Sequence, residues 1–170
     1  APANTYCPMI LWESFNDPTS MDSTRFKASK DITEGEEIIV RSQIYDYPFK
    51  TIAPHDIHKG DVVYFKDPLQ AKTFLALGDK VYYTKEILDF TKEPEWWQVA
   101  KVVGTVSCMS LSADANHLYV GTESGNVFRI SNLTHANSAA TASITSATCV
   151  VATQQIKSFP NRIVTSIAVD

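Results

Sequence analysis

Basic residues are too few and too scattered in this 170-residue chain to favour a nucleic-acid partner. Fifteen Lys and Arg stand against 19 Asp and Glu, which gives a net charge of −4 at pH 7 and leaves no basic run. Phosphate backbones are bound by clustered Lys and Arg. We therefore expect no nucleic-acid partner.

Long hydrophobic runs are also missing. No apolar stretch approaches the roughly 20 residues that a membrane-spanning helix needs, so the chain is not expected to span a membrane. The sequence begins at Ala1 without an initiator Met, and its first residues have neither the charged nor the apolar region of a signal peptide. These features favour a processed or excised chain.

Cysteines are few and far apart. Cys7, Cys108 and Cys149 form no C-x-x-C pair, which disfavours a zinc site. At most one intrachain disulfide can form, and cysteines in apolar strand contexts are more often reduced small hydrophobes. The sequence also lacks a G-x-S-x-G elbow and a Gly-rich phosphate loop, so we predict no catalytic residues and no cofactor.

The central stretch, residues 106–133, is rich in strand-forming residues. An apolar run at 106–111 is followed by Ser, Ala, Asp and Asn at 112–116, residue types that reverse the chain. A second β-rich run reaches Val120, and a turn containing Gly125 precedes the alternating strand 127–130. The pattern predicts three short antiparallel strands.

Further strands are predicted on both sides of this stretch. Gly78 and Asp79 separate the runs 72–77 and 80–84 in the manner of a tight hairpin. We also expect a hairpin of 24–28 with 38–45, and outer strands at 96–100 and 149–156. Residues 134–148 are rich in Ser, Thr and Ala without periodicity, which predicts an exposed loop.

The run SADANHLYVGTESGNVFRISNL resembles the inner three strands of a β-propeller blade of the WD40-like type. A weak internal repeat, residues 165–170 laid over 109–114, has a spacing slightly longer than four-stranded blades produce. The resemblance implies an all-β, incomplete β-propeller of about three four-stranded antiparallel blades in a single partial domain. The blades would be 6–67, 72–103 and 106–156, with 163–170 the first strand of a next blade.

A narrower resemblance involves LWESFND, RFKASKD, DVVYFKDP and LDFTKEPEWW. These runs are similar to secreted or surface propeller proteins of gliding, surface-secreting bacteria. The resemblance implies a secreted, periplasmic or outer-surface location, with a companion chain supplying the missing blades. The Ser112 to Tyr119 stretch shares only the beginning of the sialidase S-x-D-x-G-x-T-W box, and does not imply that activity.

Two groups of residues are candidate sites. His55, Asp56 and His58, with Asp61, form the one cluster with two imidazoles beside carboxylates. Adjacent loop residues fix no ligand geometry, so we read a polar loop rather than a metal site.

The second group comprises Tyr83, Trp96 and Trp97, which could stack against sugar rings. Side chains alternate along a strand, so one of two adjacent tryptophans is expected in the core and the other at the surface. Core packing is the simpler reading, and the exposed residue stays a ligand-contact candidate.

Together these patterns favour a non-enzymatic interaction scaffold that binds protein, or carbohydrate, through its loops. The candidate contact loops are 55–60, 85–95 and 134–148. Two alternatives remain open: a carbohydrate-active enzyme whose catalytic groups lie outside this chain, and a structural subunit of a secretion, gliding or filament assembly. Convergent carboxylates or arginines in a central pocket would favour the enzyme.

Overall fold

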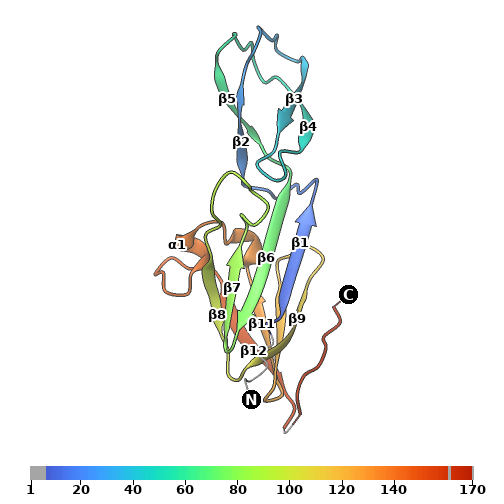
Figure 1. Cartoon of the computed structure of the whole chain (residues 1–170), viewed down its shortest axis with the longest axis vertical. Helices are drawn as coiled ribbons and strands as arrows, with labels where there is room; N and C mark the ends of the chain where they lie inside the picture. Colours follow the sequence, from blue (N-terminus) through green and yellow to red (C-terminus); the bar gives the residue numbers. More distant parts are fainter. Residues whose placement is uncertain (1–6, 161, 170) are drawn as a thin grey trace. The chain divides into compact units, whose positions relative to one another are not determined.

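The chain is all-β with antiparallel sheets, and the computed structural model describes residues 7–160 and 162–169 (Figure 1). It divides into two compact units: unit 1 comprises Ala1–Trp12, Lys72–Lys85 and Pro94–Asp170, and unit 2 comprises Glu13–Ala71 and Glu86–Glu93. The elements are β1 (Met9–Ser14), β2 (Ser23–Lys27), β3 (Glu37–Arg41), β4 (Pro48–Ile52), β5 (Val62–Lys66), β6 (Gln70–Leu77), β7 (Lys80–Thr84), β8 (Trp97–Lys101), β9 (Val106–Leu111), β10 (Leu118–Thr122), β11 (Asn126–Ser131), the 3-10 turn η1 (Leu133–His135), α1 (Ala139–Ala142) and β12 (Ala152–Ser158).

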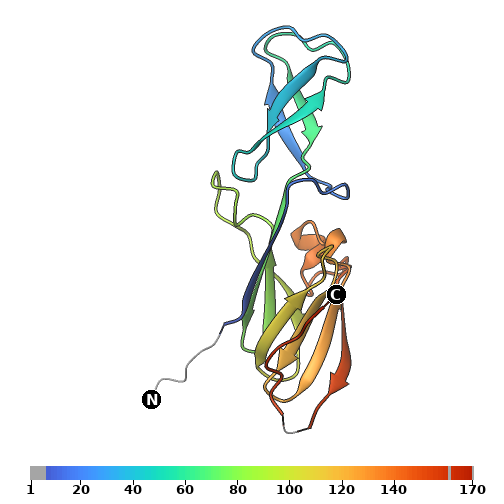
Figure 2. The same cartoon turned by 90° about the vertical axis from the view of Figure 1, so that its right-hand side faces the viewer.

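Unit 1 contains two four-stranded sheets that share one core. Their strand orders are β1-β6-β7-β8 and β12-β11-β10-β9. Both sheets contribute apolar side chains to a single buried cluster, and the two layers are visible in the lower part of Figure 2. The largest of these core residues include Phe74, Tyr83, Leu118 and Ile130. Alternation along each strand therefore places one apolar face of each sheet against the other.

The strands predicted between residues 72 and 156 are confirmed. Strands β9, β10 and β11 pair in sequence order, and β12 completes the sheet within a few residues of the expected outer strand. Strands β6 and β7 form the predicted hairpin, where Gly78 has a φ of 61° in its turn. Glycine adopts this left-handed conformation without the steric penalty of a side chain.

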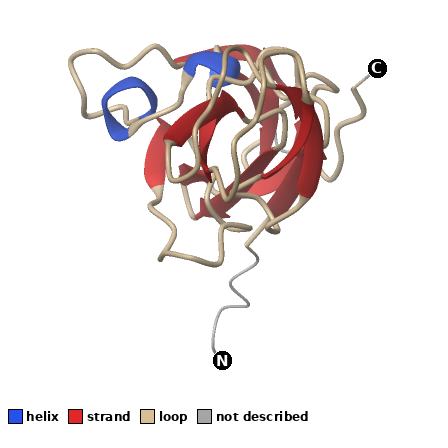
Figure 3. Ribbon diagram, turned by 90° about the horizontal axis from the view of Figure 1, so that it is seen from above, coloured by secondary structure: helices blue, strands red, loops and turns tan. Residues whose placement is uncertain are grey.

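The expectation of an exposed loop at 134–148 was wrong in part. Leu133, Ala136 and Ala142 are fully buried and belong to the core of unit 1. Ser138 caps α1, and the backbone N–H of Ile144 donates to the carbonyl of Gln98 in β8 at 2.9 Å. The two short helical elements lie beside the strands (blue in Figure 3). Small residues dispersed among Ser and Thr give no periodic signal, so the sequence did not reveal this packing.

Residues 162–169 form no strand, although 163–170 was expected to begin one; Asp170 lies outside the described residues. The segment instead runs back along the second sheet (dark red in Figure 2). The N–H of Val164 donates to the carbonyl of Thr122 at 3.1 Å, and the hydroxyl of Ser107 donates to the carbonyl of Val164 at 2.6 Å. Val164 thereby covers the outer face of β9 and β10.

Gly121 permits this close approach. A Cβ added there would lie 2.6 Å from Val164 Cγ1 and 2.7 Å from Cys108 Sγ. We expect Gly121→Val to displace residues 162–169 and to destabilise unit 1 by about 1–3 kcal/mol, as overpacking does. Tryptic cleavage after Arg162 should become faster than in the unmodified chain. An unchanged cleavage rate would show that the segment does not depend on Gly121.

Unit 2 consists of two two-stranded antiparallel sheets, β2 with β5 and β3 with β4. The predicted hairpin of 24–28 with 38–45 was therefore wrong. Strand β2 pairs with β5, which is distant in the sequence, and β3 pairs with β4, the strand that follows it. Apolar residues from all four strands and their turns form the core of this unit, with Ile57 and Val40 fully buried.

Unit 2 is an internal duplication with an offset of 25 residues. The run ASKDITEGEEIIV at 28–40 matches APHDIHKGDVVYF at 53–65, with Ala, Asp, Ile and Gly repeated in register. Backbone hydrogen bonds follow the same symmetry. Ile32 and Ile57 exchange two at 2.9 Å, while Gly35 donates to Ala53 and Gly60 donates to Ala28. The two halves are thus related by an approximate two-fold axis, which the sequence analysis missed although its signal is present.

The propeller resemblance was wrong. In the described part of the chain the strands form four separate sheets of two to four strands, none of which is closed. The expected blade 6–67 begins at a residue outside those described, and residues 7–67 form no four-stranded sheet, because β1 joins β6 and the remaining strands of that range form two pairs. Residues 106–156 do form a four-stranded sheet, and 72–103 supplies three strands of another. Short strands joined by turns are common to every antiparallel meander, so the local pattern did not determine the architecture.

Candidate functional site

An apolar surface lies on the outer face of the first sheet of unit 1. In β6 the side chains of Phe74 and Ala76 point to the core, so Leu75 and Leu77 lie on the opposite face. Together with Tyr82 and Trp96 they line a groove of about 270 Å³. The lining is almost entirely apolar, which is unusual for the solvent-facing side of an antiparallel sheet.

Strand β1 extends this surface. Ile10 packs against the core of unit 1, so Met9 and Leu11 lie on the outer side of the strand. Met9 is 66% exposed, Leu11 46% and Leu77 45%. We call Met9, Leu11, Leu75, Leu77, Tyr82 and Trp96 the apolar face. Its outward leucines were missed at first, although TFLALGDKVYY is apolar at both odd and even positions, which indicates a strand apolar on both sides.

The two adjacent tryptophans point in different directions. Trp97 is buried in the core, whereas Trp96 is half-buried and lines the groove of the apolar face. The expected division between core and surface is confirmed for this pair. Trp96 therefore stays a candidate contact residue.

Tyr83 and Trp97 are part of an aromatic cluster inside unit 1. Phe74 stacks on Tyr83 with ring centroids 4.9 Å apart, and Tyr83 meets Trp97 edge to face at 5.6 Å. Tyr83 has no exposed surface. Packing of this kind stabilises the sheet and leaves no ring face for a ligand at the surface.

In unit 2, His55, Asp56, His58 and Asp61 lie between β4 and β5, where they take part in hydrogen bonds that stabilise the duplicated turns. The carboxylate of Asp56 accepts the N–H of Glu34 at 2.8 Å, and that of Asp61 accepts the N–H of His58 at 2.9 Å. His55 Nδ1 lies 2.8 Å from its neighbour's carbonyl oxygen. Within residues 7–160 and 162–169, no three His, Cys, Asp or Glu side chains converge on a common point as metal ligands would.

Buried carboxylates have structural partners. Asp67 accepts hydrogen bonds from the Ser42 hydroxyl at 2.7 Å and from the N–H groups of Gln43 and Leu69 at 3.0 Å. Asp89, in the expected contact loop 85–95, accepts from the N–H and hydroxyl of Thr91 at 3.0 and 2.6 Å. These hydrogen bonds give each buried carboxylate the partners that a buried acidic group requires, and they stabilise the turns in which the two residues lie.

A second hollow, of about 330 Å³, includes Glu36 and Glu37. Lys30 Nζ lies 2.9 Å from Glu36, and Lys50 Nζ lies 2.7 Å from Glu37. The hydrogen bond from Lys30 lowers the pKa of Glu36, so its carboxylate stays ionised at neutral pH. An ionised, paired carboxylate is a poor general acid, so this pair does not resemble the two acids of a glycosidase.

The cysteines are present as thiols. Cys7, Cys108 and Cys149 form no disulfide, and burial raises the pKa of the Cys108 thiol. None of the helices in the described part of the chain is long and apolar enough to cross a membrane.

Comparison with protein-family models, with curated proteins and with solved structures found no match for the chain. The function must therefore be inferred from the geometry described above.

Proposed function

We propose that this chain is a non-enzymatic interaction module, secreted or exposed at the cell surface, whose protein partner binds the apolar face. The observation that carries the proposal is the large outward apolar surface of β1, β6 and β7. Such contiguous exposed apolar patches mark interaction sites in folded proteins.

The form of the surface favours a protein over a small molecule. A groove of about 270 Å³ is below the usual size of a ligand pocket, whereas the exposed side chains extend from β1 across β6 and β7. Trp96 and Tyr82, which line the groove, are residue types that are enriched among the residues that dominate binding energy in protein interfaces.

The second sheet shows how such a face is covered. Residues 162–169 lie over β9 and β10, and Val164 packs at Gly121. Within the described residues, no segment of the chain crosses the apolar face in this way. We infer that a partner presents an extended apolar strand or sheet surface to it.

Site-specific photo-crosslinking tests this function in the cells that produce the protein. A photoreactive residue at Leu77 should crosslink to one discrete protein, whereas the same residue at exposed Thr153 in β12 should not. Leu11→Arg should reduce the Leu77 crosslink at least about tenfold, because it places a charge in an apolar interface.

Two outcomes would contradict the proposal. One is equal crosslinking from Leu77 and Thr153, which would indicate random collisions. The other is a crosslink that persists undiminished in the Leu11→Arg chain, since the partner would then not contact the apolar face. If Leu77 crosslinks only to a second copy of this chain, the apolar face mediates self-association and the proposed partner is wrong.

A further inference from the structure

The duplication in unit 2 creates two equivalent outer sheet faces that differ in charge. Strands β2 and β5 correspond to β4 and β3, and the pairing registers agree: Arg25 lies opposite Tyr64 as Lys50 lies opposite Ile39. We call the exposed residues of the first pair the basic face: Ser23, Arg25, Lys27, Val62, Tyr64 and Lys66. The matched face contains Pro48, Lys50, Ile52, Glu37, Ile39 and Arg41.

Cations on the matched face are neutralised by ion pairs. Lys50 Nζ lies 2.7 Å from the carboxylate of Glu37, and Arg41 pairs with Asp46 at 3.0 Å. These exposed pairs add little stability, but they leave the matched face close to neutral.

Cations on the basic face have no such partners. Val62 occupies the position that corresponds to Glu37, so Arg25 lacks the carboxylate that pairs with Lys50. Lys66 donates to the carbonyl of Pro18 at 2.7 Å, which leaves its charge uncompensated. Within the described residues, Arg25, Lys27 and Lys66 form no ion pair. In a chain of net charge −4, this face is a local exception.

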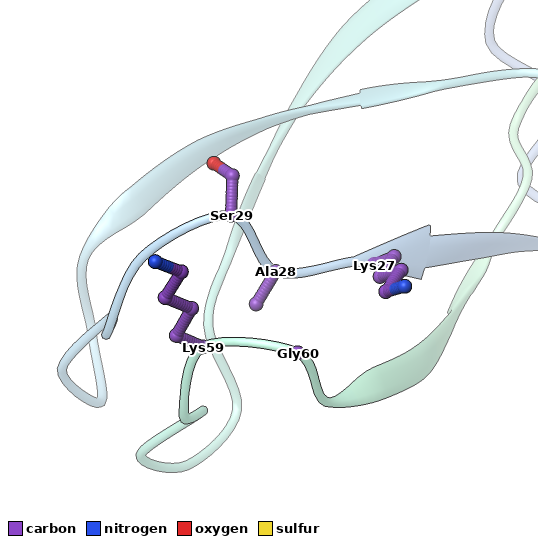
Figure 4. Close-up of a pocket in the computed structure, with 5 residues that line it drawn as sticks. All are labelled: Lys27, Ala28, Ser29, Lys59 and Gly60. Atoms are coloured by element: carbon purple, nitrogen blue, oxygen red, sulfur yellow. The ribbon is translucent and has the colours of Figure 1, made fainter.

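An aromatic ring and a hollow lie next to these cations. Tyr64, 66% exposed, stands directly across from Arg25, at the position that Ile39 occupies on the matched face. Beyond the end of β2, Lys27 and Lys59 line an open hollow of about 580 Å³ together with Ala28, Ser29 and Gly60 (Figure 4). Two lysines thus border the hollow, and one of them, Lys27, also belongs to the basic face.

We propose that the basic face binds an acidic polysaccharide, carboxylated or sulfated. Same-face residues on a strand are ~7 Å apart, so Arg25 and Lys27 present separated charges along an extended line. The apolar side of a sugar ring can stack on Tyr64 while its anionic groups meet the cations. The 15 Lys and Arg of the chain form no basic run of the kind that favours a nucleic-acid partner.

Binding to two probes, heparin and polygalacturonate, tests the proposal with the full chain at low salt, with dextran as the uncharged control. Arg25→Ala combined with Lys27→Ala should weaken binding about tenfold. The matched double variant, Arg41→Ala with Lys50→Ala, removes the same charge and should change binding less than about twofold. Tyr64→Ala should weaken binding to both polysaccharides, since it removes the stacking ring.

Salt dependence and folding provide further controls. The slope of log K against log salt should decrease by about two in the Arg25 and Lys27 variant and stay unchanged in the matched variant. All substituted side chains are exposed, so thermal midpoints should equal that of the unmodified chain.

Several results would overturn the inference. They are no binding of either acidic polysaccharide, equal binding of dextran, or equal losses in the two double variants. Tighter binding of polyglutamate, single-stranded DNA or phosphatidylserine vesicles than of both polysaccharides, at equal charge concentration, would assign the face to that other class of partner.

Discussion

Phe74→Ala is expected to destabilise unit 1 by about 3–5 kcal/mol, the usual cost of removing a buried phenyl ring. Phe74 is fully buried and stacks on Tyr83, which in turn packs edge to face against Trp97. Removing the Phe74 ring leaves a cavity next to the rings of Tyr83 and Trp97. A loss of this size is a large fraction of the stability of a typical domain.

Denaturant unfolding monitored by tryptophan fluorescence measures this effect directly. Trp12, Trp96 and Trp97 all belong to unit 1, so their emission reports on that unit. The control is Phe159→Ala, which removes the same ring from unit 1 at a position 43% exposed and should cost about 1 kcal/mol or less. Similar losses in the two variants would mean that the aromatic cluster does not form the core.

Ile57→Ala should destabilise unit 2 by about 2–5 kcal/mol. Ile57 is fully buried, and it exchanges two backbone hydrogen bonds with Ile32 across the approximate two-fold axis. Because the halves are equivalent, Ile32→Ala is expected to cost a similar amount. The two isoleucines share one core and should not behave additively when both are replaced.

Hydrogen exchange of the backbone amides detects this loss, since unit 2 contains no tryptophan. Amides of β2 to β5 should lose protection in Ile57→Ala, while the tryptophan transition of unit 1 changes less. Exposed Ile52→Ala, in the same unit, should leave protection nearly unchanged. Equal changes in both units would show that they unfold as one cooperative body.

The basic face and the apolar face lie on different units and imply different partners. Arg25 and Lys27 belong to unit 2, whereas Leu77 and Trp96 belong to unit 1. A variant that loses polysaccharide binding should therefore keep the Leu77 crosslink, and Leu11→Arg should keep polysaccharide binding. Failure of one proposal is in this way distinguishable from failure of the other.

The sequence predicted one surface aromatic residue of the candidate site, but not the other residues that surround it. The WW pair indicated one core and one surface ring, and the structure agrees. The surrounding leucines were not recognised, because a strand apolar on both sides resembles a fully buried strand. Likewise, the sequence did not indicate Arg25 and Lys27 as ligand-contact residues. Their lack of an ion-pair partner depends on Val62, which occupies the position equivalent to Glu37.

The sequence by itself determined the strand content, the Gly78 hairpin and the central three-stranded meander. These depend on side-chain alternation and turn residues, which act between neighbours in the chain. Only the tertiary structure decided that β1 joins β6, that β2 pairs with β5, and that four open sheets form in place of propeller blades. Pairing between distant strands depends on which apolar faces share a core, and no local pattern encodes that choice.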